Sequence, residues 1–286
     1  MRLYLMTDLE GVAGVRDFQE WTSPGKLYYP LARRLLTQEV NAAIDGFFAG
    51  GATSILVADG HGPSAIDLED LDPRVELLRG WGNGWPLGLE EDDFDAIAWV
   101  GQHAMSRTPY SNMTHTQGCI YLEFSINGVA LGEFGQLAVC ASQAGVRSIF
   151  AAGEQAFAAE AAALVPGIET VAVKRGTRPG RGDECSTEEY ALRNRGAVHL
   201  NPIRARERIR YGAERAMRRA IADTSFGIIP LKPPYKRTLV LRHDAEHPQR
   251  RYAIEEHPND IWALMNMPFN YKPVESDEQL RSLLVD

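Results

Sequence analysis

The sequence predicts an α/β fold with a mostly parallel central sheet flanked by helices, and a smaller C-terminal lobe. Over the first 175 residues, short apolar segments alternate with longer segments of helical periodicity, an order typical of a parallel sheet. The segments 53–58 and 95–100 are largely apolar, as expected of strands that are buried on both faces.

The chain opens with alternating strands and helices. Residues 2–6 form a short, mostly apolar strand. Apolar residues between 31 and 48 recur at helical spacing, and we expect this helix to end at Gly50-Gly51 because glycine readily adopts the left-handed conformation that closes helices. The strands at 53–58 and 95–100 follow.

A hairpin and a second strand–helix series come next. The segments 120–126 and 129–131 flank Asn127-Gly128, the strongest short signal for a two-residue hairpin turn. The other elements predicted here are a helix up to residue 144, a strand at 147–151, a helix at 154–164 and a strand at 169–174.

The C-terminal part carries weaker signals. The segment 175–185 is rich in Arg, Gly and Asp, which favours a loop, and 257–267 is ambiguous. The elements predicted here are a helix at 203–222, a strand at 237–242 and a helix at 276–284 capped by Ser276. We expect a main α/β domain at 1–190 and a smaller lobe at 191–286 that shapes the pocket and the oligomer.

The composition is that of an ordinary globular protein, with 44% hydrophobic and 24% charged residues. The net charge of −8 argues against nucleic acid as a partner, because binding of the phosphate backbone needs a basic surface. The arginines between 204 and 219 are spaced as on the solvated face of a helix.

The three cysteines, Cys119, Cys140 and Cys185, form neither a disulfide framework nor a CxxC zinc motif, so we expect reduced thiols. The N-terminal segment lacks the pattern of a signal peptide, and no apolar stretch is long enough to span a membrane. These features predict a cytoplasmic protein without a membrane partner.

The pair Asp8 and Glu10 is the most informative motif. It lies just after the first strand. Because one residue separates the two carboxylates, both project to the same side of an extended backbone. Such neighbours disfavour each other's ionisation unless a cation neutralises them. A metal ion is the usual way to hold such a pair ionised in a partly buried site.

Further ligand-type residues follow other strands. His61 and His103 lie beyond the strands 53–58 and 95–100, and Glu133 follows the hairpin in apolar surroundings where an unpaired carboxylate would be costly. Ligands of parallel sheets bind at the carboxyl ends of the strands, so we expect these side chains to meet.

Two metal ions that share a carboxylate would explain this set. We expect one ion to be held by Asp8, Glu10 and His61, and the other by Asp8, His103 and Glu133. Mixed histidine and carboxylate ligands suit Zn²⁺, with Mn²⁺ or Co²⁺ as substitutes.

The motifs also resemble a known family. Thr7-Asp8-Leu9-Glu10-Gly11 is similar to the Ser-x-Asp-x-Glu-Gly motif of the zinc-dependent D-aminopeptidases first associated with dipeptide-transport operons. The resemblance covers about the first 175 residues, in order, and diverges after that point. It continues through Asp59-Gly60-His61, Gly101-Gln102-His103, Met113-Thr114-His115, Gly132-Glu133, Ala152-Gly153-Glu154 and Val171-Ala172-Val173-Lys174.

The resemblance implies a dinuclear zinc aminopeptidase that hydrolyses the N-terminal residue, including D-residues, of short peptides or aminoacyl amides. It implies Asp8 as the bridging ligand, with Glu10, His61, His103 and Glu133 as the other ligands. It also implies His115 as the catalytic histidine, either stabilising the oxyanion or protonating the leaving amine. The assembly implied is a homo-oligomer, a decamer of stacked pentameric rings.

Several alternatives stay open. The chain could be a dinuclear metallohydrolase of another amide or of a phosphoester, or a non-catalytic peptide-binding ring protein. Asp59 is predicted to orient His61 or, alternatively, to hold the turn. The segment 175–181 either binds a substrate carboxylate or is a solvated loop. The segment 243–247 is a weak candidate for a second metal centre, because its flanking charges indicate a solvated loop.

Overall fold

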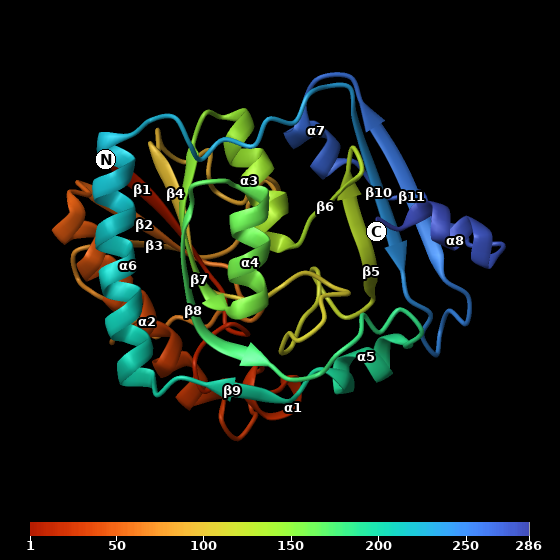
Figure 1. Ribbon diagram of the computed structural model, residues 1–286, viewed down its shortest axis with the longest axis horizontal. Helices are drawn as coiled ribbons and strands as arrows, with labels where there is room; N and C mark the ends of the chain where they lie inside the picture. The colour runs from red at the N-terminus through yellow and green to blue at the C-terminus, as the bar shows by residue number, and fades with distance from the viewer. Residues whose placement is uncertain (286) are drawn as a thin grey trace.

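The computed structural model describes residues 1–285 and contains two sheets, the larger one covered by helices (Figure 1). Within these residues the larger sheet has the strand order β3-β2-β1-β4-β7-β8-β9, and the smaller sheet has the order β12-β11-β10-β5-β6. The predicted α/β class with a mostly parallel, helix-flanked sheet is confirmed. The antiparallel sheet is separate from it and lies to the right in Figure 1.

The larger sheet is parallel except at one edge, where β9 runs antiparallel to β8. The short strands β3 and β9 were not predicted. The strands are β1 (Arg2–Thr7), β2 (Ser54–Asp59), β3 (Glu76–Leu78), β4 (Ala96–Gln102), β7 (Arg147–Glu154), β8 (Glu169–Gly176) and β9 (Ala197–His199).

Helices bury both faces of this sheet. One face packs on α2 (Tyr29–Gly50) and α6 (Pro202–Ala222), with the short α1 (Phe18–Trp21) at their end. The other face packs on α3 (Glu133–Gln143) and α4 (Gln155–Leu164). Alternate residues of each central strand therefore enter different cores, which explains why these strands are apolar throughout.

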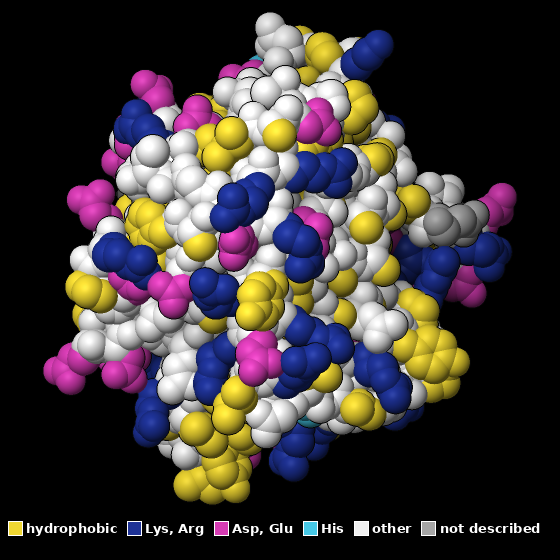
Figure 2. All heavy atoms as spheres, turned by 60° about the vertical axis from the view of Figure 1, so that its left-hand side comes forward, with side chains coloured by type: hydrophobic (Ala, Val, Ile, Leu, Met, Phe, Trp, Pro, Cys, Tyr) yellow, Lys and Arg dark blue, Asp and Glu magenta, His cyan; other side chains and the backbone are white. Residues whose placement is uncertain are grey.

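Helix α6 crosses α2 closely, with a buried face of mostly small residues. Most of its arginines are exposed, as predicted, and four of them pair with glutamates of α6 or β8. Figure 2 shows this side of the molecule, where Lys and Arg are interspersed with Asp and Glu. The pairs are Arg204–Glu207 (2.8 Å), Arg210–Glu214 (3.8 Å), Arg218–Glu214 (2.8 Å) and Arg215–Glu169 (2.5 Å).

The smaller sheet is antiparallel throughout. The predicted hairpin forms its edge, with Asn127 and Gly128 at φ +52° and +77° in the turn. Its strands are β5 (Tyr121–Ile126), β6 (Val129–Ala130), β10 (Tyr235–Leu241), β11 (Arg251–His257) and β12 (Lys272–Pro273). The sheet thus joins strands from both sides of residue 190, and the division of the chain at that residue stays a prediction.

Three short helices complete the described residues. They are α5 (Thr187–Arg193), α7 (Ile261–Asn266) and α8 (Asp277–Leu283). The ambiguous segment 257–267 divides into the end of β11 and α7, and Ser276 caps α8 as predicted by accepting the Gln279 N–H (3.1 Å). None of the described helices has the length and hydropathy needed to cross a membrane.

Candidate metal centre

Three central strands of the larger sheet end at the same edge. Asp8 follows β1, His61 follows β2 after one intervening residue, and His103 follows β4 directly. Because β1 is hydrogen-bonded to β2 on one side and to β4 on the other, these side chains start from neighbouring positions. The structure thus brings together three of the predicted site residues.

The segment after β1 packs tightly against the end of β4. The Gly11 N–H donates to the Gly101 carbonyl (2.7 Å). A Cβ at Gly11 would lie 1.9 Å from the Gln102 carbonyl oxygen, and a Cβ at Gly101 would lie 1.9 Å from that of Asp8. Glycine at both positions therefore lets this loop lie directly against the segment that carries His103.

The carboxylate of Asp8 lies between two imidazoles. Its Oδ1 is 3.4 Å from His61 Nδ1, and its Oδ2 is 3.2 Å from His103 Nε2. The Leu9 N–H donates to Oδ1 (2.8 Å), and Gln102 Nε2 donates to Oδ2 (2.9 Å). These two donors fix the carboxylate so that each of its oxygens faces one histidine, which is the orientation that a bridging ligand needs.

Two further carboxylates complete the cluster. Glu10 Oε2 lies 3.2 Å from His61 Nδ1. Glu133, the first residue of α3, places Oε1 at 3.5 Å from His103 Nε2 and accepts the Gln117 N–H (2.7 Å). All five predicted metal ligands are therefore close to one another.

Each histidine of the site directs one ring nitrogen to a backbone carbonyl and the other toward the carboxylates. In a neutral ring, a nitrogen that donates to a carbonyl leaves the opposite nitrogen with a free lone pair. Histidine ligands of metal ions are commonly oriented in this way. The bonds join His61 Nε2 to Thr22 O (2.8 Å), His103 Nδ1 to Ala104 O (2.9 Å) and His115 Nδ1 to Met113 O (2.9 Å).

Two buried atoms of the cluster, Glu10 Oε2 and His103 Nε2, have no hydrogen-bond partner among the residues that the structure describes. Burying unpartnered polar atoms is costly unless another group satisfies them. Both atoms face the centre of the cluster, so a cation bound there would satisfy both.

The electrostatics of the cluster also favour positive charge. Burial lowers the pKa of His61, but Glu10 and Asp8 outweigh it and raise that pKa to about 12. Burial is likewise outweighed at His103, where Glu133 and Asp8 raise the pKa well above its usual range. Burial would raise the pKa of Glu133, but His103 holds it at about 2. Protons and metal ions compete for such a site.

The donor set fits metal ions. Ligand atoms of Asp8, Glu10 and His103 lie within 4.8 Å of one another, and so do those of His103, His115 and Glu133. Carboxylate oxygens and imidazole nitrogens together suit Zn²⁺, Mn²⁺ or Co²⁺. In the described part of the chain, both groups found belong to this centre and neither includes the segment 243–247.

His115 lies beside the ligand cluster. Its ring stacks on that of His103, with centroids 4.0 Å apart and an interplanar angle of 13°. Its Nε2 is 3.5 Å from Glu133 Oε1. Burial, followed by the neighbouring His103, lowers the pKa of His115, so the ring is neutral in this position. A neutral imidazole can accept or share a proton with a reacting group.

Comparison with known proteins agrees with the motifs. The sequence profile of the D-aminopeptidase family matches residues 1–251. A D-aminopeptidase of Bacillus subtilis (strain 168) is 31% identical in an alignment of 211 residues that covers 69% of this chain and 76% of the relative. The chain belongs to the D-aminopeptidase family.

The fold is shared with a solved member of this family. The zinc-dependent D-aminopeptidase DppA from Bacillus subtilis, a self-compartmentalizing protease, matches with a TM-score of 0.73 and 22% identity. The match covers 92% of this chain and 94% of that chain. The predicted resemblance is confirmed, and the family profile extends past residue 175, where the motifs end.

Lys174 ends the last of the motifs that this chain shares with the family, and the structure shows what its side chain binds. Its buried ammonium, at the end of β8, donates to the carbonyl of Glu10, to that of Val15 (3.0 Å) and to Asn112 Oδ1 (2.8 Å). Burial lowers the pKa of Lys174 to about 8. Lys174 lies near the end of a parallel strand, as Asp8 does, and this position in the sequence could have indicated a role at the site.

The prediction that Asp59 orients His61 was wrong. Its carboxylate accepts the N–H groups of Ala65 (2.8 Å) and Ile66 (3.1 Å) and pairs with Arg79 Nε (2.9 Å). His61 bonds elsewhere, through Nε2 to a carbonyl. Asp59 therefore holds the loop that follows β2, because backbone N–H groups of that loop satisfy its oxygens.

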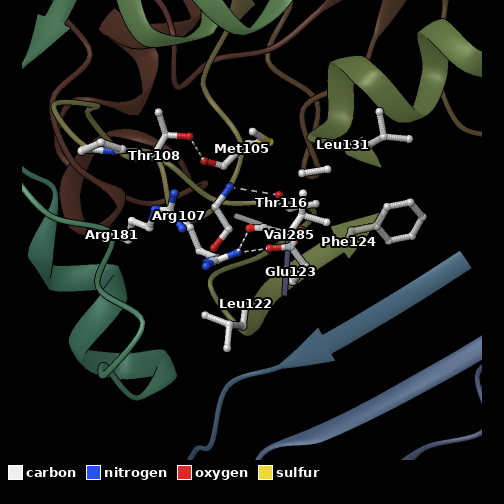
Figure 3. A pocket seen from close by; sticks show the side chains of 13 residues that line it. Met105, Arg107, Thr108, Thr116, Leu122, Glu123, Phe124, Leu131, Arg181 and Val285 are labelled. Carbon is white, nitrogen blue, oxygen red and sulfur yellow. Dashed lines mark hydrogen bonds and ion pairs between the residues drawn. The ribbon is translucent and has the colours of Figure 1, made fainter. Parts of the chain in front are cut away.

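Two cavities lie near the centre. One, of about 150 Å³, is lined in part by Asp8 and Glu133. The other, of about 190 Å³, lies beside β5 and is lined by none of the six predicted site residues (Figure 3). Arg107 pairs there with Glu123 and donates to the Val285 carbonyl (2.9 Å), and Arg181 of the arginine-rich segment 175–181 also lines the cavity.

Proposed function

We propose that this chain is a dinuclear zinc aminopeptidase that hydrolyses the N-terminal residue of short peptides or aminoacyl amides, including those with D-residues. One observation carries the proposal. In a member of the D-aminopeptidase family, three carboxylates and two histidines bring their ligand atoms together in one cluster at the carboxyl edge of a parallel sheet. The names of the two relatives support both the reaction and the metal.

Asp8 is the residue that would be shared between two ions. One ion would be held by Asp8, Glu10 and His61, and the other by Asp8, His103 and Glu133. Zinc bound there supplies a nucleophile, by lowering the pKa of water, and polarises the scissile carbonyl. Mn²⁺ or Co²⁺ would substitute in the same donor set.

The protein groups around the ions hold them and move protons. Gln102 donates to Asp8 and keeps both of its oxygens directed at the histidines. His115 is held by the Met113 carbonyl, so its Nε2 faces the reacting region. There the Nε2 lone pair takes up the proton that the attacking water releases, and the resulting imidazolium stabilises the oxyanion or passes that proton to the leaving amine, which departs neutral.

The cavity at the centre argues against a phosphoesterase. Such an enzyme binds an anionic phosphate group, which favours Lys or Arg near the metals. The residues described as lining this cavity include neither.

The name of the solved relative, a self-compartmentalizing protease, supports an assembly that encloses the active sites. For this chain we propose a homo-oligomer, a decamer of two stacked pentameric rings. Light scattering coupled to size-exclusion chromatography should give about ten times the mass of one chain. A monomer or dimer at assay concentrations would contradict the ring assembly without affecting the metal centre.

The function is tested by elemental analysis of purified protein together with a substrate panel. The panel contains D- and L-aminoacyl amides, dipeptides, N-acetylated versions of both and phosphoester reporters. We expect two zinc-like ions per chain and cleavage that requires a free N-terminal amine. Chelation should abolish turnover, and Zn²⁺, Mn²⁺ or Co²⁺ should restore it.

Two results would overturn the proposal. Two bound ions with turnover of phosphoesters alone would assign the site to another hydrolytic reaction. A folded protein that binds no metal after reconstitution would leave a peptide-binding ring protein as the better description.

A further inference from the structure

The cavity that opens onto the metal centre is lined by three tryptophans together with aliphatic and polar side chains. Apart from Asp8 and Glu133, the residues described as lining it carry no ionisable side chain. Three of the five tryptophans of the chain contribute to it. The large apolar residues of the lining are Met6, Trp81, Trp85, Leu87, Trp99 and Leu137.

Trp81 and Trp85 lie on the loop between β3 and β4. Hydrogen bonds to residues outside this loop hold it in place. The Trp85 N–H donates to Asn266 Oδ1 (3.0 Å), and Asn266 Nδ2 donates back to the Trp85 carbonyl (2.8 Å). The Tyr4 hydroxyl donates to the carbonyl of Leu87. A Cβ at Gly84 would lie 2.6 Å from Asn266 Oδ1, so glycine permits this close contact.

The third tryptophan belongs to the sheet. Trp99 in β4 is 1% exposed and packs edge-on against Phe134, with ring centroids 4.6 Å apart. The cavity wall is therefore present before any substrate binds. A preformed wall lowers the cost of ordering on binding and favours one class of side chain over others.

The size and lining of the cavity match an aromatic ring. Its volume of about 150 Å³ is that of an apolar cavity able to hold benzene. Tryptophan faces and edges give an aromatic guest contacts beyond simple area burial. A negatively charged side chain would lose its hydration there and would face the carboxylates of Asp8 and Glu133.

We propose that this cavity selects substrates whose N-terminal residue is aromatic, with Trp81 and Trp85 as specificity-determining residues. The inference rests on the proposed aminopeptidase function. In that reaction the scissile carbonyl belongs to the N-terminal residue, so this residue's side chain lies next to the metal centre. Asp8 and Glu133 connect the cavity with the metal centre, because they line the cavity and also belong to the centre.

The test compares phenylalanine amide with alanine amide, each as D- and L-isomers, in the metal-loaded protein. Amides have no second residue, so only the N-terminal side chain varies. Wild type should prefer phenylalanine amide in kcat/KM by at least about tenfold, and Trp81→Ala and Trp85→Ala should each lower that ratio by about tenfold or more. Trp85→Phe should keep the preference. Tyr211→Ala, which removes an exposed aromatic ring on α6, is the matched control and should change nothing.

A second readout does not depend on turnover. Calorimetric titration of the metal-loaded protein with free phenylalanine and free alanine measures occupancy of the cavity directly. Phenylalanine should bind at least about tenfold more tightly than alanine, and Trp81→Ala should remove the difference.

The outcomes separate this inference from the function on which it rests. Amide cleavage with an alanine preference, or equal losses for both amides in folded variants, would overturn the inference and keep the aminopeptidase. No cleavage of any amide, together with tryptophan-dependent binding of phenylalanine, would overturn the function and support the aromatic cavity. No cleavage and no selective binding would overturn both.

Discussion

At His61, His103 and His115 a backbone carbonyl accepts one ring N–H, so the tautomer is set by the fold before any metal binds. The opposite nitrogen of each ring therefore already faces the carboxylates, and at His61 and His103 a metal ion has only to displace the proton that this nitrogen carries. A site ordered in this way binds a metal ion without having to order its ligands first, which favours affinity.

The role of His115 can be separated from that of a ligand. We predict that His115→Ala retains two metal ions per chain and lowers kcat/KM by about 10²–10⁴-fold, because proton transfer is lost while the five proposed ligands remain. Elemental analysis and steady-state kinetics on the same preparation check this. His247→Ala is the control, because this half-exposed histidine pairs with Asp244 and belongs to neither ligand group of the centre. Loss of one ion in His115→Ala would instead make His115 a ligand, as its position beside Glu133 also allows.

Lys174 should influence metal binding by holding the backbone of Glu10 in place. We predict that Lys174→Met lowers the free energy of unfolding by at least about 2 kcal/mol, because buried acceptors lose their donor at about 1–3 kcal/mol each. Metal affinity, measured by competition with a chelator, should fall by about tenfold or more as the Glu10 loop relaxes. Lys236→Met on the exposed side of β10 is the control. Destabilisation with unchanged metal affinity would limit Lys174 to a structural role.

The sequence indicates some of these residues better than others for a physical reason. Asp8, His61 and His103 follow consecutive sheet neighbours, so their convergence follows from the parallel topology alone. The wall of the cavity could not be inferred in this way. Trp85 is held in place by Asn266, which is 181 residues away in the sequence, and no local pattern encodes that pairing.

At the scale of secondary-structure elements, the parallel strands were predictable because both faces are apolar. Strand β11 was not, because charged residues interrupt its pattern. One of them is Glu255, which is buried and pairs across the smaller sheet with Arg237 of β10 (3.0 Å). The guanidinium of Arg237 also donates to the Met265 and Met267 carbonyls (3.1 and 3.0 Å), which compensates its burial. A charged residue in a sequence therefore does not always mark a solvent-exposed face. It can be buried where an oppositely charged residue is buried beside it.

The contact between α2 and α6 depends on glycine. A Cβ at Gly46 would lie 2.1 Å from the Arg210 carbonyl oxygen, which is backbone and cannot move aside. We predict that Gly46→Ala lowers the free energy of unfolding by about 1–3 kcal/mol despite the better helix propensity of alanine. Urea denaturation measures the loss. Gly82→Ala, where a Cβ would meet no atom within 4 Å, is the control and should be neutral. Equal stability of the two variants would show that α6 moves away from the added Cβ at position 46 without loss of unfolding free energy.

At the scale of the whole molecule, buried carboxyl groups couple stability to pH. Glu39 on α2 is 1% exposed and accepts the Ala13 N–H (3.0 Å), while its second oxygen has no partner among the described residues. Burial raises the pKa of Glu39 to about 8, although that N–H and the charge of Lys174 act against the shift. The group is therefore neutral in the folded chain at pH 7 and ionised in the unfolded chain.

The sign of the effect follows from the raised pKa. Below the unfolded pKa of about 4.5 both states hold the proton, and above it only the folded state does, so stability is lost as the pH rises toward 8. In Glu39→Gln this loss is absent while the acceptor for Ala13 is kept. We predict that the variant gains on wild type by about 1.4 kcal/mol per pH unit between pH 5 and pH 8. Unfolding in urea at unit pH steps measures the difference, and Glu76→Gln on the exposed start of β3 is the control. Parallel stability profiles for wild type and Glu39→Gln would mean that Glu39 is ionised in the folded protein, with Lys174 and Arg206 outweighing its burial.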